Sequence, residues 1–184
     1  VNVPFCAFLD KHVLNNTQHG FLRRRSCQTN LIEFFDTITS WTDEGDSVDV
    51  LYLDFAKAFD KVNHRILLAK LEAAGIDGKL LAWLKDWLLG RQQRVVVNGE
   101  SSSWLTVDSG VPQGTVLGGP LFTVFIKDID LAILIAFIRK FADDTKAACK
   151  VNSHDDTEQF QRDIDRLMDW ADRCEMQFSP EKCK

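Results

Sequence analysis

Two adjacent carboxylates, Asp143 and Asp144, stand between an apolar stretch and Thr145-Lys146. Because neighbouring carboxylates repel each other, a fold that keeps two in a row favours a positive group beside them. A pair of divalent cations is one such group, and Mg²⁺ prefers carboxylate oxygens to nitrogen or sulfur ligands. Two ions roughly 3.5–4 Å apart can hold the attacking and leaving oxygens of an in-line phosphoryl displacement. The dipeptide by itself is more often a solvated surface turn, so the choice of a metal site depends on the rest of the chain.

A third carboxylate, Asp54, directly follows residues 48–53. That run is rich in β-formers and partly alternates, which predicts a strand that ends at Asp54. A side chain at the end of a strand commonly projects into a site. Between Asp54 and Asp143 lies the loop 109–115, whose glycines allow close backbone approach. Free N–H groups where this loop enters a helix can meet the charge or the base edge of a substrate.

Two hairpins are predicted from the pattern of apolar residues. Residues 94–97 and 104–107 flank a stretch that begins with the Asn-Gly pair 98–99, a favoured short turn. Residues 133–141 and 146–151 are predicted to form two strands around a tight turn. That turn would place both adjacent aspartates at the tip of a hairpin.

The length of 184 residues, without a repeat or a Pro/Gly-rich linker, indicates one domain with a sizeable core. Residues 1–5 lack the charged head and the apolar run of a targeting segment. The longest apolar run, residues 131–138, is far shorter than the ~20 residues of a membrane span. We therefore expect a soluble protein with no membrane partner. Apolar residues at helical spacing predict helices at residues 31–41, 63–74, 79–89, 121–130 and 159–174.

The cysteines include no C-x-x-C pair; they are Cys6, Cys27, Cys149, Cys174 and Cys183. An odd number at irregular spacing argues against a disulfide framework and against a zinc site. Reduced thiols inside a cell are the simplest interpretation.

The formal net charge of −5 argues, taken alone, against nucleic-acid binding, for which a basic surface is expected. The distribution of the charges weakens that argument. Residues 23–25 are three arginines, and Lys85, Arg91 and Arg94 form a looser basic group. The acidic residues concentrate in residues 155–175. Aspartates that bind cations would also add to the formal negative charge, although the bound cations would offset them.

Taken in order, the segments around Asp54, the loop 109–115 and Asp143-Asp144 resemble motifs A, B and C of reverse transcriptases. The similarity is greatest to LINE-type non-LTR retrotransposons and, among them, to the chicken-repeat clade. Its supporting stretches are Gln18-His19-Gly20-Phe21 and residues 48–60, 90–99, 140–146, 161–173 and 181–184.

The resemblance implies an α+β fold, a right-hand polymerase palm with part of the fingers, in which an antiparallel sheet is backed by helices. Residues 1–47 would be a fingers-side segment, and residues 48–184 would be mainly palm with motifs A to D. The thumb is expected to be absent, because the chain ends at Lys184, before the primer-grip segment.

The same resemblance implies the roles of the aspartates. Asp54 and Asp143 would ligate two Mg²⁺ ions, or Mn²⁺ in their place, with help from the carbonyl of Phe55. Asp144 would be the paired acid of the motif. One metal would lower the pKa of the primer 3′-hydroxyl, and the other would hold the triphosphate and the leaving pyrophosphate.

Three further positions match residues of the family that face the nucleotide. Phe59 matches the aromatic residue that packs beneath the sugar and rejects a 2′-hydroxyl, which favours dNTPs over NTPs. The alternative is that Phe59 belongs to the core. Gln113 and Gly114 match the motif that contacts the nucleotide and the template backbone.

Three basic residues match less specific positions. Lys182 lies where the fourth palm motif carries a lysine, which can protonate the leaving pyrophosphate as a general acid. The alternative for Lys182 is a solvated terminus. Arg23 and Arg25 belong to the fingers-side segment and can meet the triphosphate, or they can form a surface charge cluster.

One departure from the family pattern lies after motif B. Where the family continues with Pro directly after Gly118, this chain reads Gly119-Pro120. We expect this shift to loosen the helix that follows.

The sequence therefore predicts a fragment of an RNA-directed DNA polymerase that extends a DNA primer with dNTPs on an RNA template. The alternative is an inactive, truncated retroelement remnant that keeps the palm fold. A group II intron or other bacterial enzyme is a third interpretation, against which residues 90–99 and 141–146 argue. For the full-length parent, the resemblance implies action in the nucleus.

Overall fold

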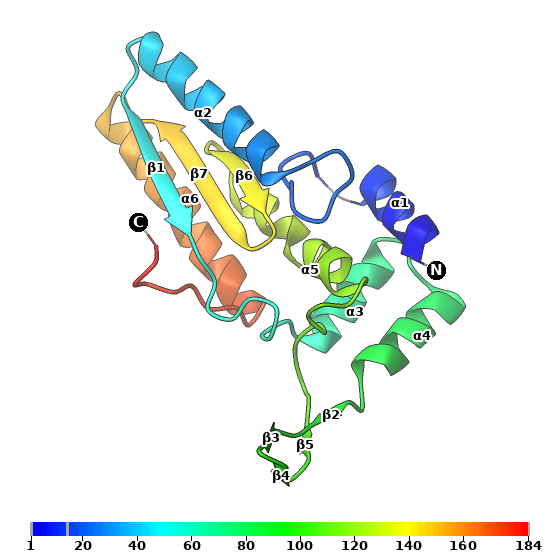
Figure 1. Cartoon of the computed structure of the whole chain (residues 1–184). Helices are drawn as coiled ribbons and strands as arrows, with labels where there is room; N and C mark the ends of the chain where they lie inside the picture. The colour runs from blue at the N-terminus through cyan, green and yellow to red at the C-terminus, as the bar shows by residue number, and fades with distance from the viewer. Residues whose placement is uncertain (1, 14, 184) are drawn as a thin grey trace.

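The computed structural model describes residues 2–13 and 15–183 of the chain. Lys184, the last residue of the predicted fourth motif, lies outside the described residues. At the centre is a three-stranded antiparallel sheet in the order β1-β7-β6 (Figure 1). Its strands are β1 (Val48–Leu53), β6 (Phe137–Phe141) and β7 (Asp144–Lys150).

The register of this sheet brings the end of β1 beside the turn between β6 and β7. Leu53, the last residue of β1, pairs with Thr145 on β7. The two-residue turn Ala142-Asp143 joins β6 to β7. Asp54 therefore leaves the sheet at the same end at which the turn lies.

Helices cover both faces of the sheet, namely α2 (Cys27–Asp43) and α6 (His154–Arg173). On one face, the ring of Phe34 in α2 stacks on that of Phe137 in β6, with ring centroids 6.2 Å apart. On the other face, Phe160 in α6 is buried together with Ala147 in β7. The sheet is thus the middle layer of three, which holds its end in a fixed place relative to the helices.

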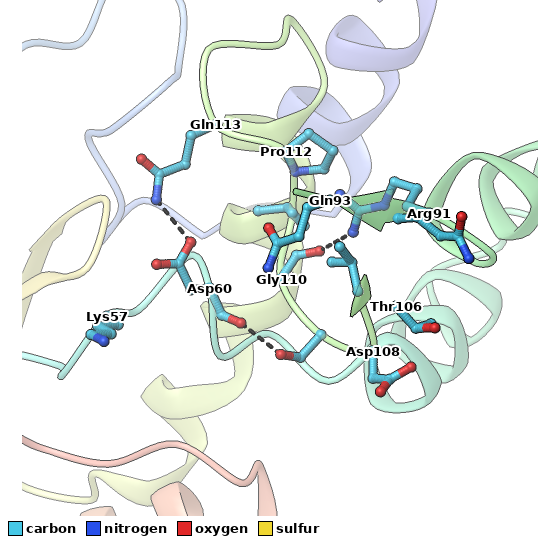
Figure 2. Close-up of a pocket in the computed structure, with 13 residues that line it drawn as sticks. Lys57, Asp60, Arg91, Gln93, Thr106, Asp108, Gly110, Pro112 and Gln113 are labelled. Atoms are coloured by element: carbon cyan, nitrogen blue, oxygen red, sulfur yellow. Dashed lines mark hydrogen bonds between the residues drawn. The ribbon is translucent and has the colours of Figure 1, made fainter. Parts of the chain in front are cut away.

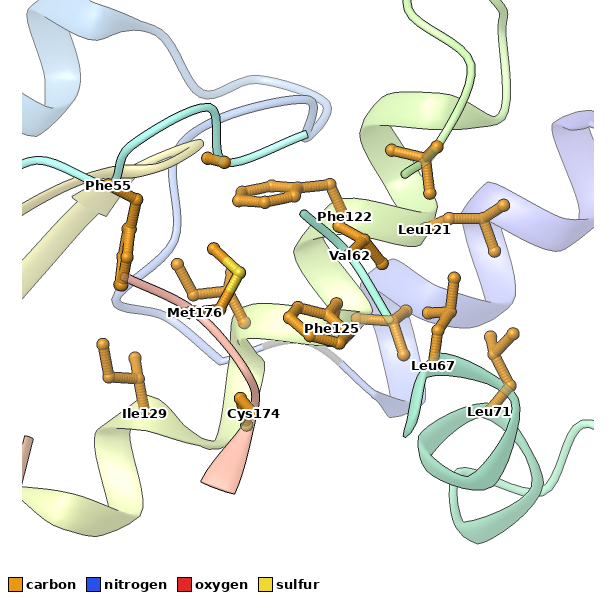
Figure 3. Packing of buried hydrophobic residues seen from close by; sticks show 14 of the residues in the cluster. Phe55, Val62, Leu67, Leu71, Leu121, Phe122, Phe125, Ile129, Cys174 and Met176 are labelled. Atoms are coloured by element: carbon orange, nitrogen blue, oxygen red, sulfur yellow. The ribbon is translucent and has the colours of Figure 1, made fainter. Parts of the chain in front are cut away.

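The main core lies beside the end of the sheet. The elements around it are α1 (Asn2–His12), α3 (His64–Ala73), α4 (Gly78–Leu88), α5 (Gly118–Ile126) and the 3₁₀ helix η1 (Lys127–Ala132). Phe122 and Phe125 of α5 are fully buried and lie beside Leu67 and Leu71 of α3 (Figure 3). A helix that is apolar on every side must be enclosed by other elements. α5 is therefore the helix around which this region packs.

A two-part hairpin arm extends from the core between α4 and α5 (Figure 1). Its strands are β2 (Gln92–Gln93), β3 (Val96–Val97), β4 (Glu100–Ser101) and β5 (Leu105–Thr106). Asn98 and Gly99 form the predicted turn with φ of 51° and 86°. The predicted pairing of 94–97 with 104–107 is wrong, because a two-residue turn pairs the residues directly beside it. β3 therefore pairs with β4, and β5 pairs with β2.

The predicted helices are present, with bounds that local capping and tertiary contacts shift. α6 begins at His154 rather than 159, because Ser153 and Asp156 form a capping box. The predicted helix 121–130 is α5 followed by η1, and α1 was not predicted. None of the described helices is long and apolar enough to cross a membrane.

The expectation that Gly119-Pro120 loosens the helix after motif B is wrong. α5 begins at Gly118, so Pro120 lies in its first turn, where an N–H has no partner within the helix. Leu121 to Ile126 then follow as an unbroken buried helix. The division of the chain into fingers and palm near residue 47 stays a prediction.

Candidate active site

The end of β1 is held by the C-terminal segment of the chain. The N–H of Ala56 donates to the carbonyl of Gln177, and the N–H of Ser179 donates to the carbonyl of Asp54, both at 2.8 Å. Between these bonds, the ring of Phe55 stacks on that of Phe178, with centroids 4.5 Å apart. The backbone on both sides of Asp54 is therefore fixed by residues that lie more than 120 positions further along the chain.

The same segment brings Lys182 to Asp54. The backbone N–H groups of Lys182 and Cys183 both donate to the carbonyl of Ser179, which turns the chain back. Lys182 Nζ lies 2.9 Å from Asp54 Oδ2. The close contact with the Asp54 carboxylate and its charge raise the pKa of Lys182. Lys182 is exposed, yet it is paired with a predicted site residue and is not a free solvated terminus.

Asp143 occupies the β6–β7 turn, as predicted, and is half-buried. Burial raises the pKa of Asp143, and the charges of Asp144 and Asp54 raise it further, whereas a backbone hydrogen bond and Lys182 lower it. Asp144, the first residue of β7, is exposed. The three carboxylates thus lie close enough to influence one another electrostatically, and their combined field favours a cation.

Asp54 Oδ2 is buried, and no donor in the described parts of the chain makes a well-directed hydrogen bond to it, although Lys182 Nζ is near. Among residues 2–13 and 15–183, no three His, Cys, Asp or Glu side chains come close enough together to hold a metal by themselves. Mg²⁺ in nucleotide sites typically uses one or two carboxylates and completes its shell with phosphates and water. Asp54 and Asp143 fit a site of that kind, which substrate completes.

Phe59 lies on the wall of a pocket of about 390 Å³ that includes Phe21, Gln113 and Gly114. Its ring stacks on Phe122, with centroids 4.3 Å apart, and meets the edge of Phe21 at 5.9 Å. One face of Phe59 thus packs on the core and the half-buried ring also borders the pocket, so its role beneath the sugar stays a prediction.

The loop 109–115 is tied to the segment that follows Phe59. Gln113 Nε2 donates to Asp60 Oδ1 at 3.0 Å (Figure 2), and the N–H of Val111 donates to the carbonyl of Phe59 at 2.9 Å. Gly110 has a φ of 87°, and a Cβ there would lie 2.9 Å from the carbonyl oxygen of Asp60. Only glycine allows this approach, so the loop fits closely over the segment.

A second pocket of about 840 Å³ lies between this loop and the base of the hairpin arm, and Figure 2 shows its lining. Arg91 Nη2 donates to the carbonyl of Gly110 at 2.7 Å across the pocket wall. Lys57 and Gln93 complete a polar lining that offers donors to a charged or hydrogen-bonding ligand. This pocket, which the sequence did not predict, adjoins Gln113.

The structure does not bring the predicted arginines to the aspartates. Arg25 Nη1 donates to the carbonyl of Asn16 at 2.6 Å and lies 2.9 Å from His19 Nε2. Arg23 is exposed on the same loop. In the described chain, neither arginine forms a hydrogen bond or ion pair with a site aspartate. Arg25 instead fixes the shape of its own loop.

Phe21 lines the same pocket as Phe59. In the sequence it stands out only as part of the stretch 18–21 that resembles the family. Its backbone φ of 60° is unusual for a residue with a side chain, and its ring is 55% exposed. A Cβ at Gly119 would lie 2.4 Å from the Phe21 ring. The glycine of the Gly119-Pro120 departure therefore makes room for Phe21, a relation between distant residues that no local pattern reveals.

The family described as reverse transcriptase (RNA-dependent DNA polymerase) matches residues 6–184. The RNA-directed DNA polymerase from mobile element jockey of Drosophila funebris is 32% identical over 143 residues, which are 72% of this chain and 15% of that protein. The protein of the same name from Drosophila melanogaster is 33% identical over 140 residues, again 72% of this chain and 15% of that protein. The chain thus spans 15% of the length of these relatives.

The fold is similar to that of the telomerase from Candida albicans, whose structure was solved with a fragment of telomeric RNA. The TM-score is 0.69 at 10% sequence identity, and the match covers 100% of this chain and 34% of that chain. At that identity the similarity shows the fold alone. It confirms the predicted α+β fold, a palm with part of the fingers in which helices back an antiparallel sheet.

Proposed function

Because this chain belongs to the reverse transcriptase (RNA-dependent DNA polymerase) family, we propose that it is the palm-centred part of an RNA-directed DNA polymerase from a LINE-type non-LTR retrotransposon. The observation that carries this proposal is that Asp54 and Asp143 lie at the same end of one sheet, close enough for the charge of Asp54 to contribute to the raised pKa of Asp143. The reaction would extend a DNA primer on an RNA template.

In this proposal, Asp54, Asp143 and the carbonyl of Phe55 hold two Mg²⁺ ions, or Mn²⁺ in their place, and Asp144 adds negative charge beside them. When bound, such ions activate the primer 3′-hydroxyl and neutralise the charge of the triphosphate. The ammonium of Lys182 is already directed at this end of the sheet by its contact with Asp54. From there it can donate a proton to the leaving pyrophosphate.

The pocket beside Phe59 is the proposed place of the sugar of the incoming dNTP. Phe122 supports the Phe59 ring from below, so the ring cannot yield to an additional hydroxyl group without losing a stacking contact. Gln113 and Gly114 form part of the same wall and would contact the nucleotide and the template backbone. Arg23 and the basic residues at the base of the hairpin arm would meet phosphates. For the full-length parent we propose action in the nucleus.

A second candidate is a palm fold without turnover. The observation in its favour is that Lys182 Nζ lies 2.9 Å from Asp54 Oδ2, a carboxylate oxygen for which a metal would compete. In the described residues, no three metal-ligating side chains come close enough together to hold a metal. Together with the Lys182 contact, this would fit a remnant that no longer assembles a metal site.

Primer extension separates the two candidates. We expect a polypeptide that carries this chain together with complete fingers and thumb to incorporate dNTPs on an RNA template in the presence of Mg²⁺ or Mn²⁺. Chelation by EDTA should abolish incorporation, because the carboxylates cannot neutralise the triphosphate themselves. The 184-residue chain is assayed alongside. No incorporation by the extended polypeptide with either metal would support the remnant.

Phe59→Ala is expected to reduce discrimination against ribonucleotides about 10- to 100-fold, the range that a pocket wall achieves against one additional hydroxyl group. The measurement is the ratio of the incorporation efficiencies of a dNTP and the matching NTP. Phe35→Ala, which removes an exposed ring from α2, is the control and should leave this ratio unchanged. Unchanged sugar selection in Phe59→Ala would show that Phe59 is a core residue only.

A further inference from the structure

Ala142, the residue before Asp143, has an unfavourable backbone conformation. Its φ is 57°, in the left-handed region that a residue with a Cβ seldom adopts. Such a conformation persists only where surrounding contacts hold it. Ala142 is also buried, so its N–H and carbonyl groups need partners.

One side chain supplies both partners. Gln18 Oε1 accepts from the N–H of Ala142 at 2.9 Å, and Gln18 Nε2 donates to the carbonyl of Ala142 at 3.1 Å. The same Oε1 accepts from the N–H of Gly20 at 2.7 Å. Gln18 is 2% exposed. This bidentate contact fixes the peptide groups on both sides of Ala142, and therefore the direction in which the chain enters Asp143.

The loop that carries Gln18 is itself attached to the sheet. The N–H of His19 donates to the carbonyl of Lys140, and the N–H of Lys140 donates to the carbonyl of Thr17, both at 2.8 Å. In Figure 1 this loop, between α1 and α2, lies beside β6. A Cβ at Gly20 would lie 2.3 Å from the backbone nitrogen of Ala142. Gly20 is therefore required for Gln18 to approach the turn so closely.

We propose that Gln18 is a positioning residue for Asp143: its side-chain amide holds the strained peptide at Ala142 and thereby sets the carboxylate for metal binding. This inference rests on the proposed function in so far as Asp143 binds a divalent cation. An apolar side chain of similar length would leave the buried N–H and carbonyl of Ala142 without partners, and the turn would relax toward a less strained conformation.

The test uses the 184-residue chain and the variant Gln18→Met, which keeps the length of the side chain but loses all three hydrogen bonds. By NMR hydrogen exchange, the amide of Ala142 should exchange about 10-fold faster than in the wild type. Binding of Mn²⁺, followed by the EPR signal of the free ion, should weaken about 10-fold or more, as expected for the loss of a contact behind a metal ligand.

Asn30→Ala is the matched control. Asn30 of α2 is 1% exposed and donates to the carbonyl of Lys140 in β6 at 3.0 Å, so its loss removes an equally buried side-chain amide that contacts the same strand without touching Ala142. We expect a comparable loss of stability in urea, with Ala142 exchange and Mn²⁺ affinity close to wild type. Gln18→Glu keeps the acceptor but not the donor and should give intermediate exchange.

The outcomes separate this inference from the proposed function. Faster Ala142 exchange together with weaker Mn²⁺ binding in Gln18→Met, with neither change in Asn30→Ala, supports the positioning role even if no polypeptide extends a primer. If Gln18→Met binds Mn²⁺ as tightly as the wild type does, the positioning role is wrong, whether or not Ala142 exchange changes, while the polymerase assignment stands. Equal effects of Asn30→Ala and Gln18→Met would reduce Gln18 to a general packing residue.

Discussion

Asp143→Asn is expected to lower RNA-templated DNA synthesis by about 10³-fold in a polypeptide that carries fingers and thumb. The change removes one charge from the end of the sheet at which Asp54 and Asp144 also lie, and a loss of that size corresponds to about 4 kcal/mol of transition-state stabilisation. Affinity for the primer-template duplex should fall only modestly, because contacts to the phosphate backbone dominate binding.

The stability of the same variant should move in the opposite direction. Burial, Asp144 and Asp54 raise the pKa of Asp143, so its charged form is disfavoured in the folded chain. A raised folded-state pKa means that stability is highest below the unfolded pKa and is lost as the pH rises through the folded pKa. At neutral pH, Asp143→Asn should therefore fold at least as stably as the wild type, as measured by urea denaturation.

Asp49→Asn is the control for this experiment, because it removes an exposed carboxylate from β1 away from the turn. It should leave synthesis close to wild type. If Asp143→Asn extended primers as well as Asp49→Asn does, the assignment of the site would be wrong. A large loss of stability in Asp143→Asn would mean that Asp143 is a structural residue.

The second large effect is on stability. Asp163→Ala is expected to lower the free energy of unfolding by about 3–5 kcal/mol, the usual result of removing one partner of a buried charge pair. The Asp163 carboxylate is fully buried in α6. It accepts from the N–H groups of Leu134, Ile135 and Ala136 at 2.9–3.1 Å, and from Arg166. The free energy of unfolding in urea at pH 7 is the measurement.

The pH dependence identifies the charge as the cause. Burial acts to raise the pKa of Asp163, but the three backbone N–H groups and Arg166 outweigh it and hold the pKa below its usual range. A lowered folded-state pKa gives stability that is present above the unfolded pKa of about 3.9 and is lost as the pH falls through the folded value. Asp163→Asn removes the charge but keeps the size of the side chain. The difference in the free energy of unfolding between wild type and Asp163→Asn should therefore be full at pH 7 and should narrow below about pH 4.

Asp165→Ala is the matched control on the same helix. Asp165 is exposed, so its removal should change the free energy of unfolding by no more than about 0.5 kcal/mol. If Asp163→Ala and Asp165→Ala unfold at the same urea concentration, the carboxylate of Asp163 does not hold the segment before β6.

That segment also shows why one strand began later than its sequence predicted. Residues 133–136 have the apolar character of a strand, but their N–H groups have other partners. The N–H of Ile133 donates to the carbonyl of Asp130, and those of residues 134–136 donate to Asp163, in a helix that follows later in the chain. β6 therefore starts at Phe137. A β-pattern reports the tendency of a segment to lie extended, whereas the partner of each N–H is decided by the whole fold.

The sequence by itself determined most of the helices and strands and the order of the motifs. The helices, the strand before Asp54 and the Asn98-Gly99 turn follow from local sterics and from the spacing of apolar residues, which neighbouring residues express without the rest of the chain. The sequence also placed a turn at Asp143, but not the contacts that hold it. The resemblance of those motifs to reverse transcriptases was confirmed by the family match over residues 6–184.

Only the tertiary structure decided which distant residues meet. The contact of Lys182 with Asp54, the room that Gly119 leaves for Phe21, and the attachment of Gln18 to Ala142 each join segments about 100 residues or more apart. No local pattern encodes such pairings, because they depend on how the packed elements place their ends. The strained turn before Asp143 is stable for that reason, since its hydrogen-bond partners come from the loop before α2.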